Sequence, residues 1–169
     1  RGPSPAPASR RVTPVDPYAA RARLLALAVP AALLGGAYVS ELGFGLYPCE
    51  MCWWQRWPHF AALGLAALAF AVPPARAWTM LAGLAILVSG LIGLFHAGVE
   101  YGWWEGVTSC AAILSEEGGN PLEQIMNTPL VRCDEPAWTL AGISLAGFNF
   151  LISTAAAVAV FLLLGKKRS

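Results

Sequence analysis

The chain contains four long runs of apolar residues, at about residues 24–46, 53–72, 78–97 and 147–164. A helix rises about 1.5 Å per residue, so a run near 20 residues crosses a hydrocarbon core about 30 Å thick. Membrane strands are about half as long and alternate in polarity, which these runs do not. The pattern therefore predicts an all-α membrane protein, a bundle of four transmembrane helices.

Small residues recur inside the third and fourth runs, as Gly83, Gly90, Gly93 and the alanines at 155–157. Such residues let helices approach closely in lipid. The composition agrees, because 57% of the residues are hydrophobic and only 12% are charged. A net charge of +1 provides no basic face for nucleic acid, so we expect a bilayer and not a nucleic acid as the surroundings.

The basic residues are sorted to one side of the predicted spans, which sets their orientation. Nine of the eleven lie before the first span, between the second and third, or after the fourth: Arg1, Arg10, Arg11, Arg21, Arg23, Arg76, Lys166, Lys167 and Arg168. Because cytoplasmic segments carry the excess of Lys and Arg, we expect both termini in the cytoplasm. Residues 47–52 and a long loop at about 98–146, between the third and fourth helices, then face outward.

The flanks differ from the apolar core in composition. Residues 1–22 are rich in Pro, Ser and Arg and are interpreted as a disordered cytoplasmic tail rather than a signal peptide. Residues 23–165 form the predicted transmembrane domain, with the outward loop at about 98–146. Residues 166–169 are a short basic cytoplasmic tail.

Four cysteines, Cys49, Cys52, Cys110 and Cys133, all fall on the outward side of this topology. The first two form a Cys-x-x-Cys motif at the start of the second run. So short a loop gains little stability from a disulfide, whereas a helix amino terminus favours the reactive thiolate, so the motif predicts electron exchange. For Cys110 and Cys133 a purely structural disulfide, worth about 3 kcal/mol, is an equal alternative.

Helical spacing places Arg56 and His59 on the same face as Cys52. A fixed cation beside a dithiol at headgroup depth suits a lipid-soluble acceptor such as a quinone, whose oxygens gain negative charge on reduction. His96, at the outer end of the third run, lies at similar depth and is a second candidate donor to that ring. The alternatives are that Arg56 snorkels to the interface and that both histidines are polar residues of that interface.

Metal and haem sites fit the spacing poorly. A c-type haem needs His directly after the second Cys, where this chain has Trp53. Structural zinc needs a second closely spaced pair, but Cys110 and Cys133 are far apart in the chain. We therefore expect no metal.

Aromatic and apolar residues gather beside the outward loop. Six of the seven tryptophans are expected in an interfacial belt: Trp53, Trp54, Trp57, Trp103, Trp104 and Trp138. The segment 136–148, "PAWTLAGISLAGF", predicts a short helix or turn lying on the membrane surface.

These features resemble the disulfide-bond formation protein B (DsbB) family of bacterial inner-membrane oxidoreductases, over approximately residues 24–164. The resemblance implies that a periplasmic, thioredoxin-fold dithiol oxidase like DsbA is re-oxidised and that its electrons pass to ubiquinone or menaquinone. It further implies that Cys110 and Cys133 meet the partner, with Cys110 forming the mixed disulfide. Cys133 would exchange with Cys49, and Cys52 would face the quinone beside Arg56.

Two other functions fit parts of the pattern. A vitamin K epoxide reductase-like protein also joins loop thiols to a quinone, but in that family the loop pair precedes the Cys-x-x-Cys, whereas here it follows. A non-enzymatic membrane subunit with two structural disulfides is the third possibility. Quinone reduction by a dithiol donor separates the enzymes from the subunit.

Overall fold

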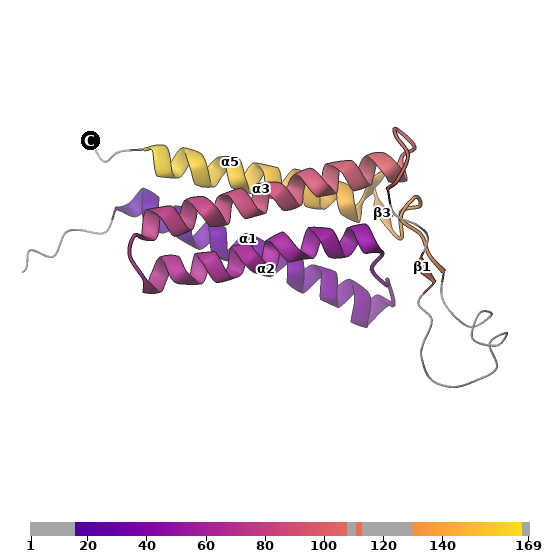
Figure 1. Ribbon diagram of the computed structural model, residues 1–169, viewed down its shortest axis with the longest axis horizontal. Helices are drawn as coiled ribbons and strands as arrows, with labels where there is room; N and C mark the ends of the chain where they lie inside the picture. Colours follow the sequence, from indigo (N-terminus) through magenta and orange to yellow (C-terminus); the bar gives the residue numbers. More distant parts are fainter. Residues whose placement is uncertain (1–15, 108–110, 113–129, 167–169) are drawn as a thin grey trace, which may run out of the picture.

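The computed structural model describes residues 16–107, 111–112 and 130–166. Its helices are α1 (Pro17–Phe44), α2 (Glu50–Ala71), α3 (Ala75–Glu100) and α5 (Leu145–Gly165). They lie side by side along the long axis of the molecule (Figure 1). Two antiparallel strand pairs join β1 (Ala111–Ala112) to β2 (Leu130–Val131) and β3 (Thr139–Leu140) to β4 (Ile143–Ser144). Both pairs lie at the end of the bundle where α2 begins and α3 ends.

Each apolar run forms one helix, and the largest difference in bounds is at the start of α1. This helix begins at Pro17, inside the segment that the sequence assigned to a disordered tail. The Asp16 carboxylate caps it by accepting the backbone N–H of Tyr18 at 3.0 Å, and proline suits the first helical position. Gly45, with a φ of 67°, ends the helix in the left-handed conformation.

Three helices, α1, α3 and α5, are long and apolar enough to cross a membrane. In the part of the chain that the structure describes, α2 does not reach the same hydropathy. Its first three turns contain the polar residues Gln55, Arg56 and His59, which lower it. The fourth crossing and the cytoplasmic location of both termini stay predictions.

Helix α3 occupies the centre of the bundle and packs most extensively against α2 and α5. Small residues permit this contact: a Cβ added to Gly93 would lie 2.9 Å from the backbone oxygen of Ala146, and one added to Gly83 would lie 3.1 Å from Val160. Ala156 and Ala157 of the predicted alanine run are buried in the same core. The expected close approach of the third and fourth runs is confirmed.

The segment before α5 is a hairpin, so the predicted surface helix is wrong and the predicted turn is right. Ala141 and Gly142 join β3 to β4 with φ values of 53° and 79°, as a tight two-residue hairpin turn requires. The Tyr101 hydroxyl fastens this hairpin to the end of α3: it donates to the Gly142 carbonyl and accepts the N–H of Ser144, each at 2.9 Å. Ser144 then caps α5 through Gly147.

Candidate active site

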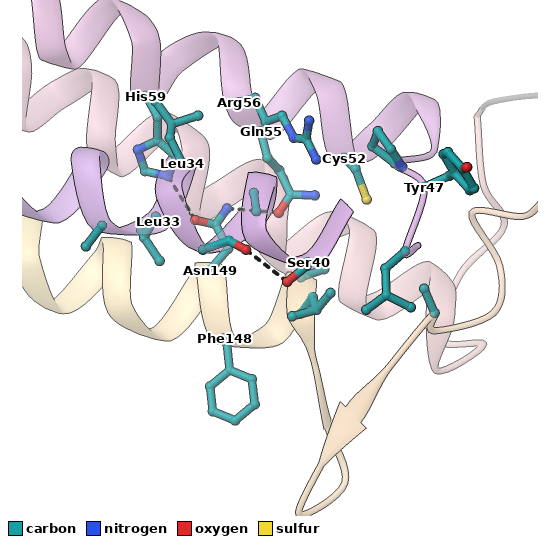
Figure 2. A pocket seen from close by; sticks show the side chains of 18 residues that line it. Leu33, Leu34, Ser40, Tyr47, Cys52, Gln55, Arg56, His59, Phe148 and Asn149 are labelled. Carbon is teal, nitrogen blue, oxygen red and sulfur yellow. Dashed lines mark hydrogen bonds between the residues drawn. The ribbon is translucent and has the colours of Figure 1, made fainter. Parts of the chain in front are cut away.

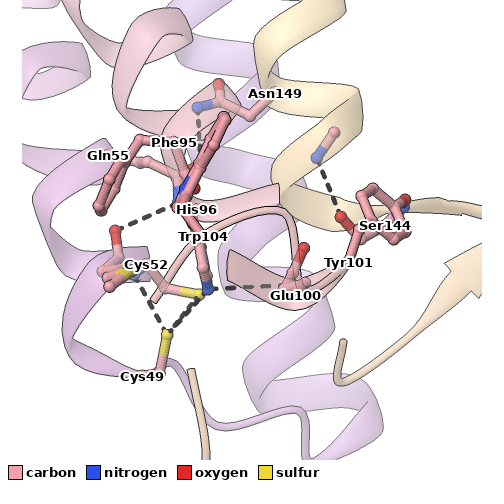
Figure 3. Close-up of polar contacts among 12 residues, drawn as sticks. Cys49, Cys52, Gln55, Phe95, His96, Glu100, Tyr101, Trp104, Ser144 and Asn149 are labelled. Atoms are coloured by element: carbon pink, nitrogen blue, oxygen red, sulfur yellow. Dashed lines mark hydrogen bonds and ion pairs between the residues drawn. The ribbon is translucent and has the colours of Figure 1, made fainter. Parts of the chain in front are cut away.

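The Cys-x-x-Cys motif forms the beginning of α2. Cys49 is the N-cap residue, and its Sγ accepts the backbone N–H of Cys52 at 3.4 Å. The two sulfurs are 3.3 Å apart (Figure 3). Both cysteines therefore stand at the helix amino terminus, as the sequence predicts, and the sulfurs are close enough to exchange electrons as a pair.

Cys49 is the member of this pair that holds its proton more tightly in the reduced protein. Its S–H donates to the Cys52 sulfur, and this hydrogen bond, together with burial, raises the pKa of Cys49 from 9.0 to about 12, although His96 lowers it. The sequence argument expected a helix terminus to favour a thiolate. At Cys49 the neighbouring sulfur outweighs that effect, so negative charge on the pair belongs on the Cys52 side.

A second group of side chains surrounds Cys49. The Nε2 atom of His96, on α3, is 3.6 Å from the Cys49 sulfur. Cys133 lies two residues beyond the end of β2. Its sulfur, the Cys49 sulfur and a ring nitrogen of His96 all lie within 4.8 Å of one another, and all three residues are buried. We call Cys49, His96 and Cys133 the thiol cluster.

Cys133 thus lies beside Cys49, the residue with which the family resemblance pairs it. Cys110 lies outside the described residues. The backbone that follows it is nevertheless placed, because Ala111 pairs with Val131 and Ala112 with Leu130 in the β1–β2 ladder. The two halves of the long loop that carry the predicted cysteine pair are therefore adjacent at this point.

Glu100 borders the thiol cluster and was missed by the sequence reasoning. Its Oε1 is 3.7 Å from the Nε2 of His96, and its Oε2 is buried without a hydrogen-bond partner among the described residues. Its spacing, four residues beyond His96 on one helix, was the available signal. The Glu100 side chain therefore places a carboxyl group next to the thiols and the imidazole of the cluster.

A cavity of about 260 Å³ opens on the other side of the motif (Figure 2). It lies between α1, the α1–α2 connection, the first turns of α2 and the start of α5. Most of its wall is apolar. The polar lining residues are Ser40, Cys52, Gln55, Arg56, His59 and Asn149. Cys52, Arg56 and His59 thus share one cavity, as their helical spacing predicts.

Arg56 is buried, 6% exposed, and does not snorkel to the surface. Its Nη1 donates to the Oε2 of Glu41, on α1, at 2.6 Å. Its guanidinium also lies 4.9 Å from the ring centroids of Tyr38 and Trp53. The charge is therefore held in place at the cavity wall. Sequence reasoning missed Glu41, although an acid near the end of an apolar run is a recognisable signal.

His59 differs from its predicted role as a polar residue of the outer interface. It is only 3% exposed, and its Nε2 lies 2.9 Å from the Oδ1 of Asn149 on α5. Ser153 also donates to that oxygen, at 2.9 Å. The polar pair on α5, which the α2 sequence cannot reveal, satisfies Nε2, whereas Nδ1 is buried without a hydrogen-bond partner among the described residues.

His96 also differs from its predicted position beside the acceptor. It does not line the cavity that contains Arg56. Gln55 stands between: this residue lines the cavity, and its Nε2 is 2.8 Å from the Nδ1 of His96. The ring of His96 therefore borders the thiol cluster and is separated from the cavity by Gln55.

Helices able to span a membrane, a Cys-x-x-Cys at one end of the bundle and a third cysteine within reach define a membrane protein suited to thiol–disulfide chemistry. The sequence matches the family described as disulfide bond formation protein DsbB over residues 19–163. The chain belongs to this family. The sequence-based resemblance is confirmed, and with it a membrane protein of disulfide-bond formation.

Curated relatives agree with this membership. Disulfide bond formation protein B 2 of Pseudomonas syringae pv. syringae is 31% identical over 83% of this chain and 87% of its own length. Disulfide bond formation protein B of Aromatoleum aromaticum is 29% identical over 89% and 96%. The protein of that name from Marinobacter nauticus is 29% identical over 74% and 79%. No solved structure matches significantly.

Proposed function

We propose that this protein re-oxidises a periplasmic, thioredoxin-fold dithiol oxidase of the DsbA type and transfers the electrons to a membrane quinone, ubiquinone or menaquinone. Its place is the bacterial inner membrane, with the cysteines on the periplasmic side. One observation carries the proposal: Cys49 belongs to the thiol cluster with Cys133, whereas Cys52 lines the apolar cavity. The motif thus contacts both a thiol donor and a compartment for an acceptor.

The thiol steps follow from the order of the cysteines. The partner's thiolate attacks Cys110 of a Cys110–Cys133 disulfide, and a mixed disulfide forms as Cys133 leaves. The Cys133 thiolate attacks the Cys49 sulfur of the Cys49–Cys52 disulfide and displaces Cys52 as a thiolate. The partner's second thiol then displaces Cys110, which attacks Cys133, restores the loop disulfide and releases Cys49. The partner is oxidised, and Cys49 and Cys52 hold the two electrons.

The cavity residues fit a quinone. The wall of the cavity is mostly apolar, which suits a quinone ring that carries an isoprenoid tail, and Arg56 offers a buried cation near Cys52. A quinone, when bound, accepts two electrons and two protons from the dithiol. Arg56 would hold the oxygen that gains negative charge, and Glu41 would keep the guanidinium oriented towards it. The apolar wall would exclude water from the sulfur of Cys52.

The test is anaerobic turnover of the reduced oxidase partner with ubiquinone or menaquinone and the purified protein. We expect quinone reduction with at least one of them and oxidation of one partner dithiol per quinone. No reduction of either would contradict the proposal and favour a non-enzymatic membrane subunit.

The loop cysteines have a separate test. Cys133→Ser leaves Cys110 as a lone thiol, so the oxidised form of the partner supplies the disulfide: the Cys110 thiolate attacks it, and one partner sulfur leaves as a thiolate. Without Cys133 to displace it, the partner should remain attached to Cys110 and appear as a mixed disulfide on a non-reducing gel. The same variant with Cys110→Ser is the control and should not trap it. Trapping that persists in the double variant would assign the partner to the Cys49–Cys52 motif instead.

A further inference from the structure

Two side-chain amides, the buried Gln55 and the half-buried Asn149, connect the cavity to the thiol cluster. Gln55 donates from its Nε2 to the carbonyl of Met51 at 3.1 Å, and this same nitrogen lies 2.8 Å from the Nδ1 of His96. Its Oε1 accepts the Nδ2 of Asn149 at 2.8 Å. The result is a hydrogen-bonded path that begins at the cavity wall and ends on the imidazole beside Cys49.

The direction of these hydrogen bonds is fixed by backbone carbonyls. A carbonyl oxygen only accepts, so the amide group that faces Met51 has to be the NH₂ of Gln55. The Nδ2 of Asn149 likewise faces the carbonyl of Ser89, at 3.1 Å. Turning either amide over would set two oxygens, or two NH₂ groups, against each other. Only one orientation of the two amides therefore satisfies every hydrogen bond along the path.

This polarity determines the tautomer of His96. Because the NH₂ group of Gln55 faces it, Nδ1 has to act as the acceptor, and the neutral imidazole carries its hydrogen on Nε2. Nε2 is the atom that faces the Cys49 sulfur at 3.6 Å and Glu100 at 3.7 Å. The thiol cluster is thus presented with an N–H donor, which stabilises a thiolate sulfur.

The same tautomer withholds the lone pair that a metal needs. Two thiols and one imidazole, all buried and within 4.8 Å, are the ligand types of a zinc site, and Glu100 stands beside them as a fourth. A zinc-bound histidine uses a bare nitrogen and donates its other N–H to an acceptor. Here the group that faces Nδ1 is a donor, so binding would require the two amides to rearrange.

We propose that Gln55 is a positioning residue that fixes the hydrogen of His96 on Nε2 and so keeps the reduced thiol cluster available for exchange and poor at capturing Zn²⁺. The role in exchange rests on the proposed function. The tautomer and the metal affinity do not, so failure of either proposal is distinguishable from failure of the other.

The metal test uses chemically reduced protein in nanodiscs and Zn²⁺ in competition with a chelator. Gln55→Glu supplies a carboxylate that accepts an Nδ1–H, which frees Nε2; Gln55→Met only removes the donor. We expect Zn²⁺ to bind Gln55→Glu about 10–100-fold more tightly than wild type, as for other groups behind a metal-bound histidine, and Gln55→Met to lie between. Equal affinities in wild type and Gln55→Glu would overturn the proposal.

Two controls locate any gain in affinity. Adding Cys133→Ser to Gln55→Glu should remove it, because the thiol cluster loses a ligand. A gain that survives this change would mean that the new Glu binds Zn²⁺ elsewhere, which also overturns the proposal. Ser153→Ala removes one donor to Asn149 without touching the Gln55–His96 contact, and it should leave the affinity at the wild-type value.

The tautomer itself is measurable by ¹⁵N NMR of histidine-labelled protein, because the chain has only two histidines. His59→Gln assigns the remaining resonance pair to His96. We expect a protonated Nε2 and an unprotonated Nδ1 in wild type and in Ser153→Ala, and a protonated Nδ1 in Gln55→Glu. A protonated Nδ1 in wild type would refute the fixed polarity even if every variant folds normally.

Discussion

The two cysteines of the Cys-x-x-Cys motif lie in contrasting surroundings although their sulfurs are 3.3 Å apart. Cys49 contacts an imidazole and, through the cluster, a loop cysteine and a carboxylate. Cys52 lines a mostly apolar cavity with one compensated guanidinium. The nearby loop cysteine suits Cys49 to thiol–disulfide exchange, whereas the apolar cavity suits Cys52 to a lipid-soluble acceptor.

In the proposed function, a spacing of two residues would separate the exchange with thiols from the transfer to the quinone. Because Cys49 is the N-cap and Cys52 lies three residues later, one sulfur points back towards the loop while the other begins the helical face that contains Arg56 and His59. Electrons then need to cross only the short gap between the sulfurs. Substitutions on either side should therefore impair different steps.

The largest effect is expected for Cys52→Ser. Quinone reduction should fall to the rate without protein, because the cavity loses its only sulfur among the described lining residues. A single exchange between Cys133 and Cys49 requires no cavity and should still be possible once a Cys49 disulfide to a small thiol is supplied. Stopped-flow turnover and mass spectrometry of the mixed disulfide measure the two steps. Residual quinone reduction above a tenth of the wild-type rate would show that Cys52 is not required for the step at the cavity.

Arg56→Ala should raise the quinone KM about tenfold, which corresponds to ~1.4 kcal/mol, and leave exchange at the thiol cluster unchanged. The reason is the loss of the cation at the cavity wall. Glu41→Gln is the matched comparison: it keeps the guanidinium but removes its partner, so the expected rise is smaller. Steady-state kinetics over a range of quinone concentrations decide, and an unchanged KM in Arg56→Ala would return Arg56 to a purely structural role.

Cys49 should make the reduced protein sensitive to alkali. Its pKa is about 12 in the fold and 9.0 ordinarily, so the unfolded chain releases the proton first. The stabilising contribution is complete below pH 9 and is lost as the pH rises towards 12. Unfolding midpoints of reduced wild type should fall more steeply over this range than those of Cys49→Ala. If the unfolding midpoints of the two proteins fall in parallel with pH, the pKa of Cys49 is not raised in the folded protein.

The last prediction compares two helical glycines with different neighbours and concerns stability alone, with no expected effect on a reaction step. Gly93→Ala would press against the Ala146 carbonyl at 2.9 Å and the Asn149 amide at 3.0 Å, and should destabilise the bundle by ~1–3 kcal/mol. Gly64→Ala meets nothing within 4 Å and should stabilise α2 by ~0.5–1 kcal/mol. Denaturant unfolding in mixed micelles compares them; equal effects would mean that the α3–α5 contact is looser than the structure shows.

The sequence predicted what depends on local pattern. The apolar runs predicted the four helices to within a few residues at most of their ends. Helical spacing predicted that Cys52, Arg56 and His59 lie on one face of α2. The expected small-residue contacts of Gly83 and Gly93 also hold. These features depend on residues near one another in the chain, so their periodicity is visible in the sequence.

What the sequence missed depends on partners far away in the chain. The burial of His59 follows from Asn149, 90 positions later, and the orientation of His96 follows from Gln55, 41 positions earlier. Depth within a bundle is likewise not encoded in spacing, so the sequence could not show that His96 borders the thiol cluster and not the cavity lined by Arg56. The turn before α5 was predicted, but a helix stayed an alternative because Ala141, unlike glycine, gives no sequence signal for a positive φ.

Photolabelling with an azido-quinone, followed by mass spectrometry, tests most directly whether Cys52 faces the acceptor. The account predicts adducts on the cavity wall, at Leu33 or Leu34 of α1 and Leu145 or Ala146 of α5, and competition by unlabelled quinone. Competed labelling confined to residues away from this wall, such as Leu84 and Leu91 on the exposed side of α3, would contradict it.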